Sequence, residues 1–372
     1  MAKAHDDQYA AAGVDYAVVD PGTLLAQRAA ASTASTLGAR GAREVTESRG
    51  ESAYVVALGD RHLATVTEAL GTKNLVADAV RPYTQKTHYD AVAKDTVATI
   101  LNDLATVGAR PVCLTAYWGA GSSDWFSDQE RMKDLVSGWT AACTEARCAW
   151  GGGETQVLSG MIDPKVLVLG GSATGFVANE RELLLGSRVT AGDVILFAPA
   201  TGIHANGLSL ARKVAETLPR GYETPVPGDP AGRSYGEVLL DPTPLYGVLL
   251  EALFDAGVEV HYAVNVTGHG FRKLMRSTNE LSYVVRALPA VPPVLAMLAE
   301  AAAMSPTEAY GTFNMGAGFA FYVAPPSVDR ALEVARAHGS SLLRAGSVEK
   351  GKRRVVLEPL GVTFEGETLG IR

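Results

Sequence analysis

Ala53-Tyr54-Val55-Val56-Ala57-Leu58 is the first strand-like stretch of this 372-residue chain, and the pattern that it begins decides the fold class. From here to Val177, apolar strand-like runs alternate with segments whose apolar residues recur at helical spacing. Such alternation is typical of sheets covered by helices. We therefore predict an α/β (α+β) fold whose first domain contains a mixed sheet.

A second series of strands and helices begins with Val194-Ile195-Leu196-Phe197, after a more polar stretch between Glu180 and Gly192, and lasts to about Leu357. A chain of this length is long enough for two domains. We predict an N-terminal domain at residues 1–180, a C-terminal domain at residues 181–358 and a tail at residues 359–372.

The composition indicates an ordinary globular protein, with 47% hydrophobic and 20% charged residues. A net charge of -7 argues against nucleic-acid binding, because a polyanion partner needs a dense basic surface. The start of the chain, Met1 to Asp7, has no apolar run, and the apolar stretch Val291 to Met304 is interrupted by prolines and Glu300. We expect a cytoplasmic protein with no membrane partner.

The sequence contains three cysteines, Cys113, Cys143 and Cys148. They form no Cys-x-x-Cys pair and have no histidine at metal-ligand spacing. We expect them to be thiols of the core, where free cysteine is often buried.

The segment Ala149-Trp150-Gly151-Gly152-Gly153-Glu154-Thr155 predicts a glycine turn between a helix and a strand, with one acidic side chain. Glycine takes positive φ without steric cost, so backbone N–H groups can approach a ligand closely there. The Glu154 carboxylate would point into that opening and could carry a catalytic metal. A plain connection is the alternative, because glycine-rich turns are common.

The helix predicted from Asp95 to about Val107 has two different faces. Its apolar stripe is Val97, Ile100, Leu101, Leu104 and Val107. Its polar stripe is Asp95, Thr99, Asn102, Asp103 and Thr106. Asp95 could complement the helix dipole while Asn102 and Asp103 form a solvated face. Paired with Glu154, the stripe could instead supply oxygen ligands for Mg²⁺.

Two glycine-flanked segments, Gly202 to Leu210 and Asn265 to Phe271, predict loops that enter helices. In the first, His204 is either a proton shuttle near pH 7 or a structural residue. In the second, N–H groups at a helix start would favour phosphate, or Thr267 is a simple cap. Neither a Walker-type phosphate loop nor a Gly-x-Gly-x-x-Gly fingerprint after a strand occurs, so ATP would bind by another architecture.

Taken in order, these elements resemble the aminoimidazole ribonucleotide synthetase family, also called the phosphoribosylformylglycinamidine cyclo-ligase family. The resemblance spans most of the chain. The matching segments are Ala12-Gly13-Val14-Asp15, Gly71-Thr72-Lys73, Asn102-Asp103-Leu104, Gly152-Gly153-Glu154-Thr155, Gly160-Met161, His204-Ala205-Asn206-Gly207-Leu208-Ser209-Leu210, Thr267-Gly268 and Thr312-Phe313-Asn314-Met315-Gly316.

The resemblance implies a homodimer in which the N-terminal sheets pair into a barrel, with ATP near that interface, and a C-terminal α/β sandwich. It also implies an ATP-dependent ligase of purine biosynthesis. In that family ATP activates the formyl amide oxygen of formylglycinamidine ribonucleotide, and a nitrogen of the same nucleotide substrate then closes the imidazole with loss of phosphate.

The resemblance also implies roles for residues of this chain. Catalytic roles fall on Lys73, which would neutralise charge during phosphoryl transfer, and on His204 and Asn206, which would orient the amide. Asp95 and Glu154 would hold Mg²⁺ on the ATP phosphates. ATP binding is implied for Gly71, Thr72, Asp95, Asn102, Asp103, Gly152, Gly153, Glu154 and Thr155, and substrate binding for Thr267, Gly268, Gly270 and Asn314.

The chain departs from the family pattern at positions that face ligands. The acidic glycine motif before Gly71 is Glu68-Ala69-Leu70, an early lysine is Ala10, and a glycine of the phosphate loop is His269. A phenylalanine-glycine loop has no clear equivalent between Glu44 and Gly50. Two alternatives stay open: a related ATP-dependent enzyme that phosphorylates another carbonyl or acid, and a nucleotide-binding regulator without turnover.

Overall fold

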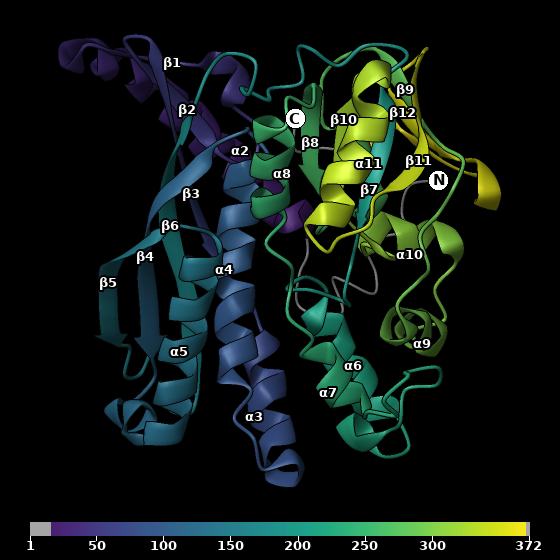
Figure 1. Ribbon diagram of the computed structural model, residues 1–372. Coiled ribbons are helices and arrows are strands. Elements are labelled where there is room, and N and C mark those ends of the chain that lie inside the picture. Colours follow the sequence, from purple (N-terminus) through teal and green to yellow (C-terminus); the bar gives the residue numbers. More distant parts are fainter. Residues whose placement is uncertain (1–15, 370–372) are drawn as a thin grey trace.

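The computed structural model describes residues 16–369, which form two domains, each built around one sheet (Figure 1). The predicted α/β class is confirmed. The predicted features at Ala10 and Ala12–Asp15 lie outside the described residues.

Sheet A, in the N-terminal domain, has six strands among the described residues, in the order β1-β2-β3-β6-β4-β5. Neighbouring strands are antiparallel except β4 and β5, which are parallel. The predicted strand at Ala53–Leu58 is confirmed as β2. The strands are β1 (Ala42–Glu44), β2 (Tyr54–Leu58), β3 (Arg61–Ala69), β4 (Arg110–Ala120), β5 (Ala149–Val157) and β6 (Leu167–Val177).

Helix α4 (Tyr89–Ala105) covers one face of sheet A and also packs against the second domain, so it stands between the two (Figure 1). It begins six residues before the predicted start at Asp95, and Gly108, with φ +81°, follows its end. The predicted apolar stripe is buried, with at most 3% exposure for Val97, Ile100, Leu101, Leu104 and Val107. Each such side chain contributes about 1.5–3 kcal/mol of hydrophobic stabilisation.

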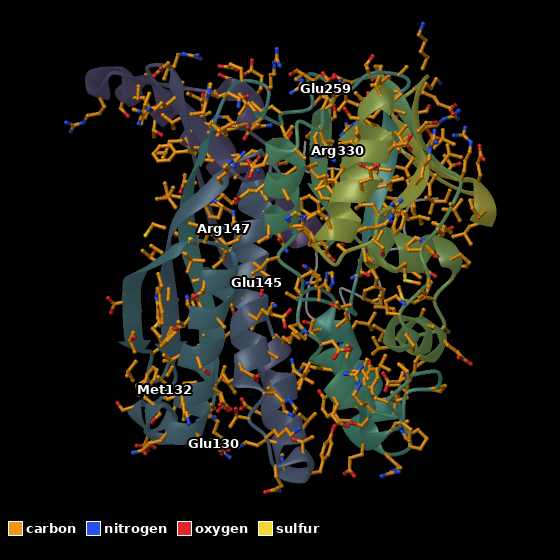
Figure 2. The ribbon with its side chains drawn as sticks, in the orientation of Figure 1. Glu130, Met132, Glu145, Arg147, Glu259 and Arg330 are labelled. Atoms are coloured by element: carbon orange, nitrogen blue, oxygen red, sulfur yellow. The ribbon has the colours of Figure 1, made fainter. Side chains whose placement is uncertain are left out.

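Three other α-helices of the described chain belong to the N-terminal domain: α2 (Tyr16–Ser32), α3 (Lys73–Thr84) and α5 (Gln129–Glu145). Helix α5 packs along α4. Glu130 and Glu145 mark the two ends of α5, and both side chains are well exposed (Figure 2). Cys143 and Cys148, at and after the end of α5, are buried free thiols as predicted, while Cys113 is partly buried.

The other face of sheet A is largely uncovered in the single chain. On it, the hydroxyl oxygens of Thr67 and Ser172 are 2.8 Å apart in an exposed hydrogen bond. Val168 and Phe176 are 36% and 40% exposed there. A sheet face that combines exposed apolar and hydroxyl side chains is a surface suited to pairing with another sheet.

Sheet B, in the second domain, has seven strands within residues 16–369, in the order β13-β12-β9-β11-β7-β10-β8. Strand β10, which lies between β7 and β8, is buried along its whole length, as an apolar strand covered on both faces should be. The strands are β7 (Val194–Pro199), β8 (Val260–Asn265), β9 (Leu281–Val285), β10 (Ala317–Val323), β11 (Leu343–Lys350), β12 (Arg354–Leu357) and β13 (Val362–Glu365).

Helices accompany sheet B between its strands. They are α6 (Leu208–Thr217), α7 (Tyr235–Leu239), α8 (Tyr246–Asp255), α9 (Pro293–Ala301), α10 (Pro306–Thr312) and α11 (Val328–Ala337), together with the 3-10 helix η5 (Gly270–Met275). The predicted strand at Val194–Phe197 and the helix after Gly207 are confirmed as β7 and α6. No helix in residues 16–369 combines the length and the hydropathy needed to cross a bilayer.

The last strand of sheet A in the sequence, β6, ends at Val177, and the first strand of sheet B, β7, begins at Val194. The predicted domain boundary at residue 180 lies between these two strands. The predicted tail differs from the structure. β13 pairs with β12, and Phe364 and Leu369 are 3% and 2% exposed, so this part of the chain belongs to the second domain. A four-residue strand carries too little pattern to be predicted from sequence.

Candidate active site

A fully buried ion pair joins the start of α3 to α4. Lys73 Nζ lies 2.6 Å from one carboxylate oxygen of Asp95, and neither side chain is exposed. Lys73 Nζ also donates to the backbone carbonyl of Asp241 at 2.8 Å. The other Asp95 oxygen accepts hydrogen bonds from the backbone N–H, at 3.0 Å, and the hydroxyl of Thr243. Both charges are therefore engaged inside the protein, where they hold a segment of the second domain.

Asn102, two turns along α4, holds the next part of the same segment. Its amide nitrogen donates to the carbonyl of Pro244, and its amide oxygen accepts from the N–H of Tyr246, both at 2.8 Å. The alternative of a solvated face for Asn102 and Asp103 is wrong, because the second domain buries both side chains.

His204 lies next to this ion pair, in the loop before α6, and is 3% exposed. Its Nε2 accepts from the N–H of Thr201 at 3.4 Å, which assigns the ring proton to Nδ1. Nδ1 has no hydrogen-bond partner among the described residues. Burial, and then the positive charge of Lys73, lower the pKa of His204 to about 3. His204 is therefore neutral at pH 7, which disfavours the predicted proton shuttle and makes an Nδ1–H donor available to a substrate oxygen.

A second polar cluster forms near the C-terminal end of α4, where β3 and β8 meet the helix. Asp103 accepts a hydrogen bond from the amide nitrogen of Asn265 at 2.8 Å. The amide oxygen of Asn265 is buried and has no hydrogen-bond partner within the described part of the chain. Glu68 lies on the face of sheet A that α4 covers, since a Cβ on its register partner Gly171 would be 3.1 Å from Ile100.

The two carboxylates of this cluster influence each other. Burial, and then the negative charge of Asp103, raise the pKa of Glu68 to about 7. Carboxylate and amide oxygens are ligands that Mg²⁺ prefers, and a cation relieves repulsion between neighbouring carboxylates. Glu68, Asp103 and the free amide oxygen of Asn265 therefore fit a magnesium ion that also binds phosphate or water. Residues 16–369 contain no group of three or more His, Cys, Asp or Glu side chains arranged to hold a metal by themselves.

Lys273 supplies a buried positive charge to the same cluster. It lies on η5, is 8% exposed, and donates a short hydrogen bond to the hydroxyl of Thr267. Burial, together with the charge of Arg276, lowers the pKa of Lys273 to about 8, although the charges of Asp103 and Glu68 oppose this shift. The cluster thus combines acidic and basic groups from both domains.

The loop before η5 has the backbone of a glycine-rich turn. His269 and Gly270 have φ values of +70° and +52°. A Cβ on Gly270 would lie 2.3 Å from the carbonyl oxygen of Tyr310, so only glycine fits there. Burial, and then the charge of Lys273, lower the pKa of His269 to about 4, which keeps it neutral at pH 7. The predicted helix start is a six-residue 3-10 helix.

Glu154 lies away from both clusters. Ala149–Val157 is strand β5 itself, not a helix-to-strand turn, and Gly152 and Gly153 form an irregularity in its pairing with β4. Glu154 is the neighbour of Tyr117, whose hydroxyl contacts Gln156 on the uncovered face of sheet A. Asp95 is on α4, at the opposite face. The structure therefore does not bring the predicted metal pair, Asp95 and Glu154, together within one chain.

The remaining predicted residues divide between the two domains. Gly71, with φ +80°, precedes Thr72 at the start of α3, and a Cβ there would lie 4.0 Å from the carbonyl of Ala205. This brings the loop before Lys73 next to the loop of His204 and the half-buried Asn206. Asn314 has both ends of its amide engaged, with Gly202 and Gly316. Gly268 is half-buried beside Thr267, and Gly152, Gly153 and Thr155 are exposed on β5.

Sequence reasoning missed three residues of the second cluster. Glu68 was noted only as a departure, and Asn265 and Lys273 were not selected, although both flank the segment at Thr267. The available signal was their position before and after a glycine-rich loop. Their importance depends on α4 bringing Asp103 to that loop from more than 150 residues away.

The two α/β domains meet along α4, where acidic, amide and basic side chains converge. The protein is therefore a two-domain protein with a polar site at the domain junction. The chain belongs to the AIR synthase related protein family: the family's N-terminal domain matches residues 50–177 and its C-terminal domain matches residues 190–358. The predicted resemblance is thereby confirmed.

Relatives in this family align over most of the chain. A phosphoribosylformylglycinamidine cyclo-ligase of Methanothermobacter thermautotrophicus is 35% identical over 298 residues, 79% of this chain and 83% of the relative. The enzyme of that name from Carboxydothermus hydrogenoformans is 31% identical over 357 residues, 94% of this chain and 98% of the relative.

Solved structures share the fold at lower identity. Hydrogenase maturation protein HypE in complex with ATP has a TM-score of 0.55 and 21% identity, covering 73% of this chain and 78% of that one. Phosphoribosylformylglycinamidine synthase II from Thermotoga maritima has a TM-score of 0.56 and 19% identity, covering 86% of this chain and 46% of that one.

Proposed function

We propose that the protein catalyses the ATP-dependent cyclisation of formylglycinamidine ribonucleotide to aminoimidazole ribonucleotide in purine biosynthesis. Its relatives of 31–35% identity carry the name of that enzyme over most of their length. The structural observation that carries the proposal is the cluster of Glu68, Asp103, Asn265 and Lys273 at the domain junction.

ATP would bind with its phosphates at this cluster. Glu68, Asp103 and Asn265 supply oxygens for Mg²⁺, which when bound would neutralise phosphate charge. This assignment replaces the predicted pair of Asp95 and Glu154. The support is the unpartnered amide oxygen of Asn265 and the raised pKa of Glu68, about 7, which a cation would lower.

The formyl amide of the substrate would lie between the two clusters. Transfer of the terminal phosphoryl group to the amide oxygen makes that oxygen a leaving group, and attack by the substrate's own nitrogen closes the ring and releases phosphate. His204 would donate from Nδ1 to a substrate oxygen, since its imidazole is neutral and this donor is unpaired in the described residues. Fixed donors of this kind act by orientation and by stabilising developing charge. Asn206, on the same loop, would orient the amide with it.

The other predicted residues are assigned contacts to ATP, to phosphate or to the loops of the site. Gly71 and Thr72 border the loop of His204 and suit contacts to ATP, and Thr267, Gly268 and Gly270 suit contacts to phosphate. Asn314 would act indirectly, by fixing the loop at Gly202.

A homodimer is the proposed assembly, formed through the uncovered face of sheet A. Exposed Val168 and Phe176 on that face would be buried against a second copy. Glu154 on the same face would then lie at the interface, where it could serve the site of the partner subunit. We also propose a cytoplasmic location.

A second candidate is an ATP-dependent enzyme of the same superfamily that phosphorylates another carbonyl or acid. His269 favours it, because an imidazole occupies a left-handed backbone position in the loop beside Lys273 and changes the shape of the ligand site. A regulator would bind nucleotide at the same site and would not catalyse phosphoryl transfer.

The test is ADP release by the purified protein with Mg-ATP, with and without formylglycinamidine ribonucleotide, together with an assay for aminoimidazole ribonucleotide. Product and ADP in equal amounts are expected. ADP release that requires a different carbonyl or acid would favour the second candidate, and nucleotide binding without ADP release would indicate the regulator.

A further inference from the structure

The reaction needs a cation near the transferred phosphoryl group, and the sequence pointed to Lys73 for that role. In the structure the Lys73 ammonium group is fully buried, 2.6 Å from Asp95 and 2.8 Å from the carbonyl oxygen of Asp241. Moving it onto a phosphate would leave Asp95 as an uncompensated buried charge, which is strongly unfavourable. Lys73 therefore does not suit a role in phosphoryl transfer.

Lys273 has the properties that Lys73 lacks. Its Nζ donates to the neutral hydroxyl of Thr267, and no carboxylate of the described residues lies within ion-pair distance of it. The charges of Glu68 and Asp103 nevertheless act on it, so it belongs to the same cluster as the two carboxylates. A buried ammonium group without a direct counter-ion is costly unless an anion binds beside it. An anionic ligand at this cluster would provide that partner.

The surrounding charges favour a phosphate over a carboxylate side chain as this partner. Lys273 shares η5 with Arg272, and Arg276 follows directly after the helix. A magnesium ion on Glu68 and Asp103 would remove the excess negative charge opposite Lys273. A phosphate can bridge a metal ion and an ammonium group, because it offers several acceptor oxygens at once.

Resting on the proposed function, we propose that Lys273 is a catalytic residue whose Nζ contacts an oxygen of the phosphoryl group that ATP transfers. In that step the bond from the terminal phosphorus to ADP breaks, and a bond from phosphorus to the formyl amide oxygen forms. Lys273 stays protonated throughout and stabilises the charge on the phosphoryl oxygens. Thr267 holds the ammonium group in place by accepting one of its hydrogens.

The test compares Lys273→Met, Lys273→Arg and the wild-type full-length protein in turnover of Mg-ATP with formylglycinamidine ribonucleotide. Loss of a preorganised charge contact should lower kcat about 100-fold in Lys273→Met, with a small change in the KM of the nucleotide substrate. Lys273→Arg keeps the charge, so its kcat should be about tenfold higher than that of Lys273→Met. Circular dichroism and thermal unfolding establish that each variant is folded. Turnover of Lys273→Met within threefold of wild type would overturn the role.

A second measurement keeps this role separate from the choice of substrate. ADP with aluminium fluoride and Mg²⁺ imitates a phosphoryl group in transfer, and its binding is measured by calorimetry without the nucleotide substrate. Wild type should bind this complex about 100-fold more tightly than Lys273→Met, whereas the two should bind ADP alone within about threefold. If wild type binds in this way but makes no aminoimidazole ribonucleotide, the proposed function fails and the role of Lys273 stands. Equal binding by the two proteins, or no binding by wild type, would overturn the role.

Discussion

The polar stripe of α4 and the glycine-rich strand β5 carry the two carboxylates that looked most alike as metal ligands, and the structure treats them in opposite ways. Asp95 is enclosed at the domain junction by Lys73 and Thr243. Glu154 is exposed on the uncovered face of sheet A. The difference shows that one sheet separates two acidic residues that were predicted to bind the same metal ion. Proximity to the second domain, rather than residue type, decides which of these two carboxylates is buried and paired and which is exposed.

The largest effect is expected at the buried carboxylate, Asp95, when its partner Lys73 is replaced. Lys73→Met should lower the free energy of unfolding by about 3–5 kcal/mol, because it leaves Asp95 buried and unpaired. Urea denaturation followed by circular dichroism measures this loss. The matched control is Lys94→Met, which removes the partner of Glu145 in an exposed pair on the same domain and should cost at most about 1 kcal/mol. Equal effects of the two variants would contradict the structural role of Lys73.

Asp103 tests whether the far end of the polar stripe faces the ligand. Asp103→Asn keeps the size of the side chain and should lower kcat about 100-fold, since it removes a carboxylate from the proposed site for Mg-ATP. The same charge change at Asp90→Asn, in the exposed first turn of α4, should leave turnover within twofold. Steady-state kinetics at saturating Mg²⁺ distinguishes them, and unchanged turnover in Asp103→Asn would remove this residue from the site.

Mixing subunits of two variants tests whether Glu154 acts in the site of the partner subunit. Glu154→Gln and Asp103→Asn should each be nearly inactive, with the fold retained. If Glu154 serves the partner's site, unfolding and refolding the two together should restore about a quarter of wild-type turnover, because about half of the dimers form with one intact site of two. Analytical ultracentrifugation checks that dimers are present. Mixed dimers without regained turnover would place Glu154 in the site of its own chain or outside both.

The smallest effect concerns Glu68. Burial and the charge of Asp103 raise the pKa of Glu68 from 4.5 to about 7. The unfolded chain ionises near pH 4.5 and the folded protein near pH 7, so ionisation of Glu68 reduces stability as the pH rises between these values. Glu68→Gln should therefore be more stable than wild type by about 1–3 kcal/mol at pH 8 and equally stable below pH 4.5. Denaturation without divalent ions measures the difference, with the exposed Glu216→Gln as control. A constant difference across this range would contradict the buried carboxylate pair.

Much of the fold could be predicted from local pattern. Val194–Phe197 and Ala53–Leu58 are apolar runs of strand length, and the stripe from Val97 to Val107 has helical spacing, so each specifies its own secondary structure and its buried face. β13 could not be predicted, since its four residues become a strand only by pairing with β12.

The candidate site was predictable only in part. Asp103, Thr267 and His204 were selected because polar residues beside glycines or along a helix are visible in the sequence. Asn265 and Lys273 were not, because their significance comes from neighbours that are distant in the chain. The neutral state of His204 likewise depends on burial and on the charge of Lys73, neither of which a sequence displays.

The sequence by itself determined the α/β class, the two-domain division, the apolar core face of α4 and the family, because these follow from periodicity and from motifs in a fixed order. Tertiary structure alone decided that Lys73 and Asp95 neutralise each other, that Glu154 faces away from them, and that Glu68, Asp103, Asn265 and Lys273 form one charged cluster. The physical reason is that charge interactions and desolvation depend on distance and burial in space, and these are set only when the second domain closes over α4.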